Sequence, residues 1–142
     1  MDLGLAGKKA IVTGGTRGIG RSIVELLADE GCHIGLCARD ETAVHATVAE
    51  LAAKGIRATG KAVDVGDGPA LKSWVEAVGG ELDGLDIVVA NASGFGVTPD
   101  EEGWQKSYTV DMMGTVQAVE AAMPFLETSD AASVVVIASV GA

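Results

Sequence analysis

A glycine-rich segment near the N-terminus has the residue types that bind phosphate groups. It follows a short apolar run, residues 9–13, and contains Gly14, Gly15, Gly18 and Gly20. Glycine permits turns with positive φ and lets backbone N–H groups approach a phosphate, which the N-terminus of a following helix also attracts. Apolar residues recur at helical spacing from Ile19 onward. The segment therefore stands between a predicted strand and a predicted helix, and we interpret it as a phosphate-binding loop.

Two arginines indicate which phosphorylated ligand this loop binds. Arg17 lies inside the loop, and Arg39 follows the second apolar run, residues 33–38. In a dinucleotide site the end of the second strand faces the adenosine ribose. A carboxylate there accepts a hydrogen bond from a free 2′-hydroxyl, whereas arginine binds a 2′-phosphate. Because Asp40 suits a helix cap better, NADP(H) is favoured over NAD(H). The alternative is that both arginines lie on the surface without a ligand.

Apolar runs of strand length alternate with helical patterns along the whole chain. The predicted strands are residues 9–13, 33–38, 58–65, 85–90 and 133–138. Asp40 and Asp67 are positioned to cap helices, and a longer helix is expected from about Trp104 to Phe125. This alternation predicts a doubly wound α/β fold with a parallel sheet, in one domain spanning residues 1–142. On the long helix, Met112, Val116, Val119 and Met123 share one side, and their spacing favours a place in the core.

In such sheets ligands bind beyond the carboxyl ends of the strands. Each predicted strand ends in polar residues or glycine, and these are Thr13-Gly14, Arg39-Asp40, Asp64, Asn91-Ala92-Ser93 and Ser139. The candidate site residues therefore lie at one edge of the sheet.

Composition excludes several classes of function. A formal net charge of −10 argues against a nucleic-acid partner, which needs a basic face. Cys32 and Cys37, five residues apart on one extended run, would point to opposite faces and form neither a disulfide nor a shared metal site. His33 and His45 add no zinc-ligand spacing. With no apolar leader and no run of membrane-spanning length, we expect a cytoplasmic protein without a metal.

Four elements together resemble the short-chain dehydrogenase/reductase family. They are the loop Thr13–Gly20, the pair Asp64-Val65, the run Ala90–Ser93, and Ser139, which stands at the position of the family's catalytic serine. The run Ala90–Ser93 resembles the family's Asn-Asn-Ala-Gly element, with its first and last residues changed. The resemblance implies an oxidoreductase that interconverts a small carbonyl and a secondary alcohol, as a homodimer or homotetramer. The implied cofactor-binding residues are Thr13, Gly14, Thr16, Arg17, Gly18, Ile19, Gly20, Arg39, Asp64, Val65, Asn91 and Ala92.

Two departures from the family pattern leave alternatives open. Asp111 stands where the family has an asparagine of its proton relay, and an ionised carboxylate cannot donate a hydrogen bond. The family's Tyr-x-x-x-Lys is not found, because the single tyrosine, Tyr108, has no lysine four residues later. One alternative is therefore a non-catalytic dinucleotide-binding fragment or pseudoenzyme. A doubly wound methyltransferase is a third hypothesis, but it would favour an acidic residue in place of Arg39.

The last predicted strand bears on whether the sequence is complete. Residues 133–138 are apolar at nearly every position, which suits a strand with a neighbour on each side. Long apolar edge strands are aggregation sites that stable proteins avoid. We therefore expect these 142 residues to be the front part of a longer protein and the isolated 142-residue chain to be poorly soluble.

Overall fold

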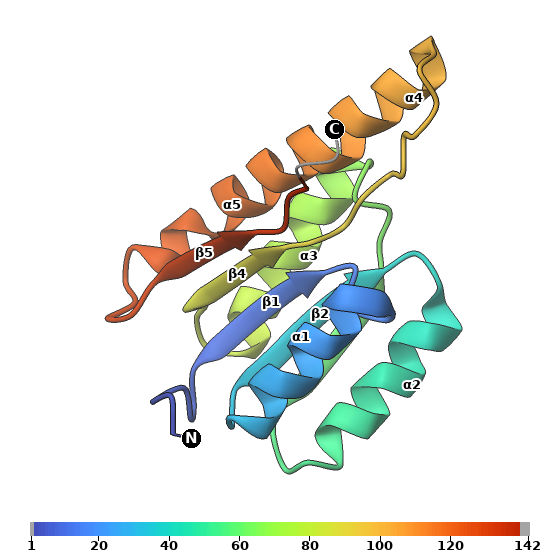
Figure 1. Cartoon of the computed structure of the whole chain (residues 1–142). Helices are drawn as coiled ribbons and strands as arrows, with labels where there is room; N and C mark the ends of the chain where they lie inside the picture. Colours follow the sequence, from blue (N-terminus) through green and yellow to red (C-terminus); the bar gives the residue numbers. More distant parts are fainter. Residues whose placement is uncertain (1, 140–142) are drawn as a thin grey trace.

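In this computed structural model, residues 2–139 are described and form one parallel five-stranded sheet with helices on both faces (Figure 1). The elements are β1 (Lys9–Thr13), α1 (Gly18–Asp29), β2 (His33–Ala38), α2 (Glu41–Ala52), β3 (Ala58–Ala62), α3 (Gly68–Glu81), β4 (Ile87–Ala90), α4 (Glu101–Lys106), the π-helical segment η1 (Ser107–Met112), α5 (Met113–Leu126) and β5 (Ser133–Val136). The strand order is β3-β2-β1-β4-β5, and every neighbouring pair is parallel. The predicted doubly wound α/β fold is confirmed.

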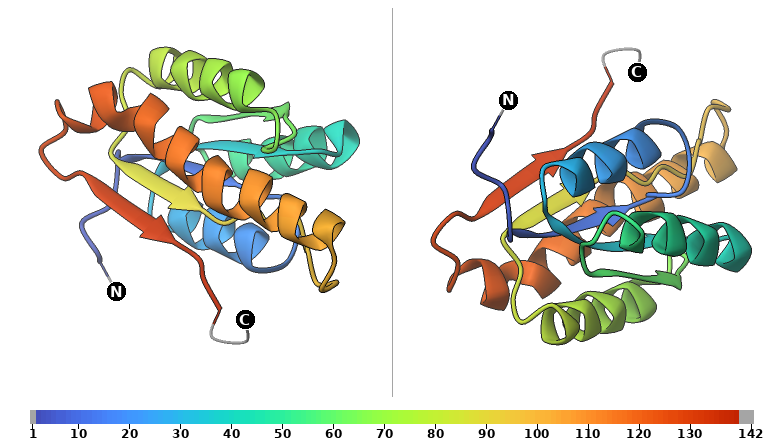
Figure 2. Two further views of the ribbon diagram at one scale, coloured as in Figure 1. Left: turned by 90° about the horizontal axis from the view of Figure 1, so that it is seen from above. Right: turned by 90° about the horizontal axis from the view of Figure 1, so that it is seen from below.

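Two apolar layers hold the helices against the sheet. Ala10 and Val12 of β1 belong to the layer under α1 and α2, whereas Ile11 belongs to the layer under α3 and α5, as the alternation of side chains along a strand requires. Figure 2 shows these helices on opposite faces of the sheet. Cys32 is buried in the first layer and Cys37 in the second, and both are free thiols. The expectation that they point to opposite faces is confirmed.

Aspartates cap three of the helices. Asp40 accepts a hydrogen bond from the Ala43 amide, and Asp67 accepts one from the Ala70 amide, each at 3.1 Å. Asp100 caps α4 in the same way, at 2.8 Å from the Gly103 amide. Each cap satisfies an N–H group that has no partner inside its helix. The two caps expected from the sequence are confirmed.

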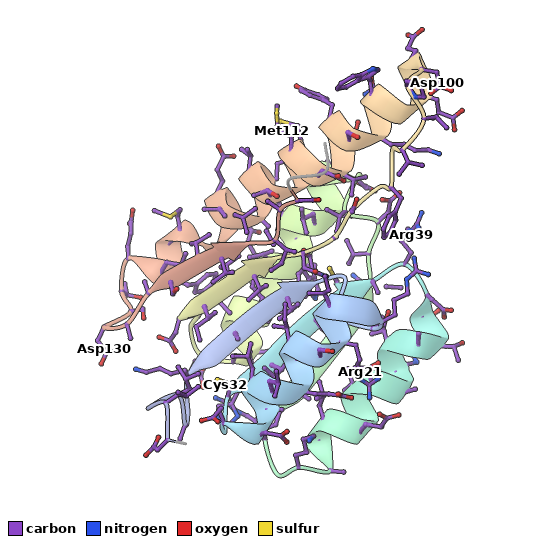
Figure 3. The ribbon with its side chains drawn as sticks, viewed as in Figure 1. Arg21, Cys32, Arg39, Asp100, Met112 and Asp130 are labelled. Atoms are coloured by element: carbon purple, nitrogen blue, oxygen red, sulfur yellow. The ribbon has the colours of Figure 1, made fainter. Side chains whose placement is uncertain are left out.

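The long helix begins at Glu101 and runs through α4, η1 and α5 without a break. The buried residues of α5 are Leu126 and four small residues, Gly114, Ala118, Ala121 and Ala122. Small side chains let this helix approach α3 closely. Met112, Val116 and Met123 lie on the other side, 52%, 39% and 40% exposed, and Met112 points away from the sheet in Figure 3. Placing these three residues in the core was therefore wrong, whereas Val119, the fourth residue of the predicted stripe, is partly buried against the core.

Strand ends follow the length of the partner strand. β3 ends at Ala62 and not at Val65, because Ala62 pairs with Ala38, the last residue of β2. β4 begins at Ile87 and β5 ends at Val136, both shorter than expected. β5 pairs only with β4 among the described strands, and its valines are 43–52% exposed. Beside it, an apolar groove of about 650 Å³ runs along α1.

Candidate functional site

The loops that follow β1 and β4 meet at the carboxyl edge of the sheet. Strand order reverses here, since β2 lies on one side of β1 and β4 on the other. Thr13 Oγ1 accepts hydrogen bonds from the amides of Asn91 and Ala92, at 3.0 and 3.1 Å. The Asn91 side-chain amide donates in return to the carbonyls of Thr13 and Gly14, both at 3.1 Å. Four of the predicted site residues, Thr13, Gly14, Asn91 and Ala92, therefore fasten the two loops together.

The glycine-rich loop is packed between β2 and β4. The amides of Gly14 and Gly15 donate to the Cys37 carbonyl, at 2.8 and 3.2 Å. A Cβ atom added at Gly20 would lie 2.0 Å from the Gly14 carbonyl oxygen and 2.4 Å from Asn91 Nδ2. Since no side chain fits there, glycine at position 20 lets the start of α1 approach the loop. This close approach leaves the N-terminus of α1 at the mouth of the loop.

The N-terminus of α1 carries no negative partner of its own. Arg17 is its N-cap residue, with φ −152° and ψ 164°, and its side chain makes no capping hydrogen bond. The first turn also contains no acidic residue. The first amides of this 12-residue helix and its dipole therefore favour an anion from outside. Thr16 is half-buried beside this terminus, whereas Gly18 and Ile19 are exposed.

Arg17 and Arg39 lie at the same edge, and both are exposed. Figure 3 shows Arg39 beyond the carboxyl end of β2. Within residues 2–139 neither guanidinium forms an ion pair, although Arg21 pairs with two glutamates. In a chain with a net charge of −10, unpaired arginines beside an uncapped helix make a local positive region. This region fits a phosphorylated ligand.

Asp64 and Val65 follow β3 at this edge and differ in accessibility. Asp64 is exposed, and its Oδ1 accepts a hydrogen bond of 2.8 Å from the Gly66 amide. The Val65 side chain is buried against Gly114, where an added Cβ would come within 2.3 Å of it. A ligand would therefore meet the Asp64 carboxylate but only the backbone of Val65.

The two predicted catalytic residues occupy different settings. Asp111 lies in η1, and its carboxylate accepts hydrogen bonds from Ser93 Oγ at 3.0 Å and the Gly94 amide at 2.7 Å. Its carbonyl accepts another from Thr115 Oγ1 at 2.7 Å. Ser139 is exposed and follows β5, which ends at Val136. Asp111 is therefore a fixed hydrogen-bond acceptor. Ser139 lies just beyond the end of β5, the strand that pairs with β4.

Sequence reasoning gave no role to two residues of the loop after β4. Ser93 was noted only as a change in the family's motif, yet it is a partner of Asp111. Phe95 was not singled out, although its ring lies 6.0 Å from Arg17 Cζ. Its backbone has φ +50°, which no sequence pattern indicated because aromatic residues rarely adopt it.

Comparison with known proteins identifies the family. The model of the short chain dehydrogenase family matches residues 8–142, and the chain belongs to this family. It is 38% identical to an isoepoxydon dehydrogenase of Penicillium expansum, over 98% of this chain and 55% of that protein. It is 34% identical to dehydrogenase/reductase SDR family member 4 of Sus scrofa, over 97% and 51% of the two chains. The chain thus spans about half the length of these relatives.

Solved structures agree with the fold and differ in cofactor. The L-sorbose reductase of Gluconobacter frateurii, complexed with NADPH and L-sorbose, has a TM-score of 0.89 and 32% identity, over 99% of this chain and 55% of that one. An NAD⁺-bound xylitol dehydrogenase has a TM-score of 0.87 and 25% identity, over 95% and 54%. Membership of this family therefore supports a dinucleotide-binding site and places the chain in a family of oxidoreductases. The same membership argues against the methyltransferase hypothesis.

Two further findings on the described residues concern membrane-spanning helices and metal ions. None of the helices in residues 2–139 is long and apolar enough to cross a membrane. The same residues contain no group of three or more His, Cys, Asp or Glu that could hold a metal ion.

Proposed function

We propose that the protein containing this chain is an NADP(H)-dependent oxidoreductase that interconverts a small carbonyl compound and a secondary alcohol. The observation that carries the proposal is the N-terminus of α1, which no side chain caps, at the same edge of the sheet as Arg17 and Arg39, two exposed arginines without an ion pair within residues 2–139. Relatives named as dehydrogenases and reductases support the reaction class. The NADPH complex of L-sorbose reductase supports the cofactor, although an NAD⁺-bound relative shows that the family uses both.

The residues at the carboxyl edge fit the parts of a dinucleotide. Backbone amides at the start of α1 suit the pyrophosphate, the arginines suit a 2′-phosphate, and Asp64 suits the adenine amino group. We assign to this cofactor site Thr13, Gly14, Thr16, Arg17, Gly18, Ile19, Gly20, Arg39, Asp64, Val65, Asn91 and Ala92. When bound, the nicotinamide supplies the hydride chemistry, and the protein supplies orientation and electrostatics.

Ser139 and Asp111 are the proposed reaction residues of this chain. The Ser139 hydroxyl would donate a hydrogen bond to the substrate oxygen and polarise a carbonyl. Asp111, which already accepts from Ser93 and Gly94, would act as an acceptor and hold the loop after β4 in place. Exchange of the substrate proton is assigned to the family's Tyr-x-x-x-Lys, in the half of the relatives' length that this chain does not span.

Exchanging Arg39 for aspartate tests the cofactor. In the full-length protein, Arg39→Asp should weaken NADPH binding by about 10- to 100-fold, because a charge-assisted hydrogen bond to the 2′-phosphate is worth about 1.5–3 kcal/mol. NADH should bind as well as before or better, because a carboxylate accepts from the 2′-hydroxyl. Lys72→Asp is the matched control, since it makes the same charge change at an exposed position of α3. An unchanged ratio of the two affinities would remove the argument for NADP(H).

A dimer or tetramer is proposed through the exposed side of the long helix. Trp104, Tyr108, Met112, Val116 and Met123 recur along α4, η1 and α5 and are 39–73% exposed. A continuous apolar stripe of this kind is typical of an interface. Met112→Glu should shift the full-length protein toward monomer in analytical ultracentrifugation. Leu26→Glu, at an exposed position of α1, should leave the association unchanged.

A further inference from the structure

Phe95 is an exposed aromatic residue held in an unusual backbone conformation. It lies in the loop between β4 and α4, its side chain is 64% exposed, and its φ is +50°. The left-handed region is uncommon for bulky residues and costs free energy. Burial of the ring in the core does not offset this cost. Another interaction must therefore account for the placement of the ring.

The loop on both sides of Phe95 is fixed to the long helix. Before it, the Gly94 amide donates to Asp111 Oδ1 at 2.7 Å, and the Phe95 amide donates to Ser93 Oγ at 3.1 Å. After it, Gly96 packs so closely on α4 that an added Cβ would lie 2.1 Å from the Gly103 carbonyl oxygen. These contacts leave the Phe95 backbone little freedom. The ring is therefore presented from a rigid support.

What the ring contacts is Arg17, the N-cap residue of α1. Arg17 Cζ lies 6.0 Å from the centroid of the Phe95 ring, within the range of a cation–π interaction. Arg17 forms no ion pair within residues 2–139. A carboxylate partner would neutralise the guanidinium and compete with a phosphate. An aromatic face holds the guanidinium in place and leaves its charge and its N–H donors available.

We propose that Phe95 is a positioning residue for cofactor specificity, which holds the Arg17 guanidinium where it binds the 2′-phosphate of NADP(H). The inference rests on the proposed NADP(H) preference. It adds a residue from the loop after β4 to the part of the site that recognises the adenosine ribose. The loop after β1 supplies the Arg17 guanidinium, and Phe95 in the loop after β4 fixes the direction in which that guanidinium points.

Removing the aromatic face tests this role. In the full-length protein, Phe95→Leu should weaken NADPH binding by about two- to fivefold, the range of an exposed cation–π interaction, and leave NADH binding unchanged. Phe95→Tyr keeps the ring, and the exposed position has room for its hydroxyl, so NADPH affinity should stay at the wild-type value. Both affinities are measured by isothermal titration calorimetry. In an Arg17→Gln background, Phe95→Leu should have no further effect on NADPH.

The outcomes separate this inference from the cofactor proposal. If the wild-type protein binds NADPH no better than NADH, the cofactor proposal fails, and the role of Phe95 fails with it. If the wild type prefers NADPH and Phe95→Leu keeps that preference, only the role of Phe95 is overturned. Equal weakening of both cofactors would also overturn it, because a general disturbance of the loop does not distinguish a 2′-phosphate from a hydroxyl.

Discussion

Ser93 Oγ donates a hydrogen bond of 3.0 Å to Asp111 Oδ2 and so joins the loop after β4 to the π-helical segment of the long helix. Both residues are departures from the family pattern, which has glycine and asparagine at these positions. A carboxylate only accepts hydrogen bonds, and a serine hydroxyl is a donor that glycine lacks. The two departures are therefore chemically matched, since the serine supplies the donor that the aspartate needs.

This pairing predicts that the two positions are energetically coupled. Ser93→Gly removes a donor from Asp111, and each single exchange, Ser93→Gly or Asp111→Asn, should destabilise the full-length protein by about 1 kcal/mol. The double variant restores the family's pair, so its free energy of unfolding should exceed the value expected from adding the single effects by about 0.5–1.5 kcal/mol. Urea unfolding of the four proteins completes the cycle. Additive effects on the free energy of unfolding would show that positions 93 and 111 are not energetically coupled.

The close approach at Gly20 predicts a site that tolerates no side chain. In Gly20→Ala the new Cβ would meet the Gly14 carbonyl oxygen at 2.0 Å, so the loop or the helix must shift. We expect a loss of about 1–3 kcal/mol of stability, as for overpacking elsewhere, together with at least tenfold weaker dinucleotide binding. Calorimetric titration and thermal unfolding measure the two effects.

Gly80→Ala is the control for that exchange. Gly80 also lies in a helix, α3, but an added Cβ meets nothing within 4 Å. It should leave binding unchanged and stabilise the protein by up to about 1 kcal/mol, since alanine favours the helix. If Gly20→Ala behaved like Gly80→Ala, the packed loop geometry would be refuted.

Features that depend on neighbours in sequence were predictable here. Asp40 and Asp67 were identified as caps because a cap interacts with amides three residues later. The glycine-rich loop was identified because its residues and their spacing are local. The strand ends were not, since β3 stops where its partner β2 stops at Ala38. That length is set by a segment elsewhere in the chain.

Which side of a helix is buried was also hard to predict from the sequence alone. Ile19 and Leu26 are among the apolar residues that recur at helical spacing along α1, but they are 62% and 66% exposed, and Val24 and Ala28 are buried instead. Small residues can bury a helix more closely than large ones, so hydrophobic size alone misplaces the contact side. At the site, the contact of Phe95 with Arg17 was equally hidden, because it joins two loops 78 residues apart through a left-handed backbone.

Burial predicts that both cysteines are unreactive in the folded protein. Burial raises the pKa of Cys37 to about 12, and it also raises the pKa of Cys32, whose thiol donates to the Leu5 carbonyl. At pH 8 Cys37 therefore forms almost no thiolate and Cys32 forms less than an ordinary cysteine, and the thiolate is the reactive species. A thiol reagent such as DTNB should therefore react with these two thiols only as fast as the structure opens, and Cys32 and Cys37 should together account for two equivalents after denaturation.

An introduced thiol provides the comparison for this experiment. Ser22 is exposed on α1, so Ser22→Cys should add one equivalent that reacts at once under native conditions. Rapid reaction of a native thiol in the unmodified protein would show that one of the two buried positions is accessible.

His33 predicts a loss of stability on the acid side of neutrality. Its Nδ1 accepts a hydrogen bond of 3.0 Å from the Arg57 amide, which joins the starts of β2 and β3 and requires that nitrogen to be unprotonated. Burial first, and then the charges of Arg57 and Lys9, lower the pKa of His33 below its ordinary value of 6.5. The unfolded chain therefore takes up this proton before the folded one does. The stabilisation is complete above pH 6.5 and is lost as the pH falls through the folded pKa.

A non-titrating acceptor isolates this effect. His33→Asn keeps a hydrogen-bond acceptor, so the difference in unfolding free energy between wild type and variant should favour the wild type less at pH 5 than at pH 7.5. His45→Asn removes the other histidine, on the exposed side of α2, and shows how much of the change any histidine would cause. Urea unfolding at both pH values gives the differences, and a ring titration by NMR gives the pKa directly. A wild-type advantage that is the same at both pH values would contradict the assignment to His33.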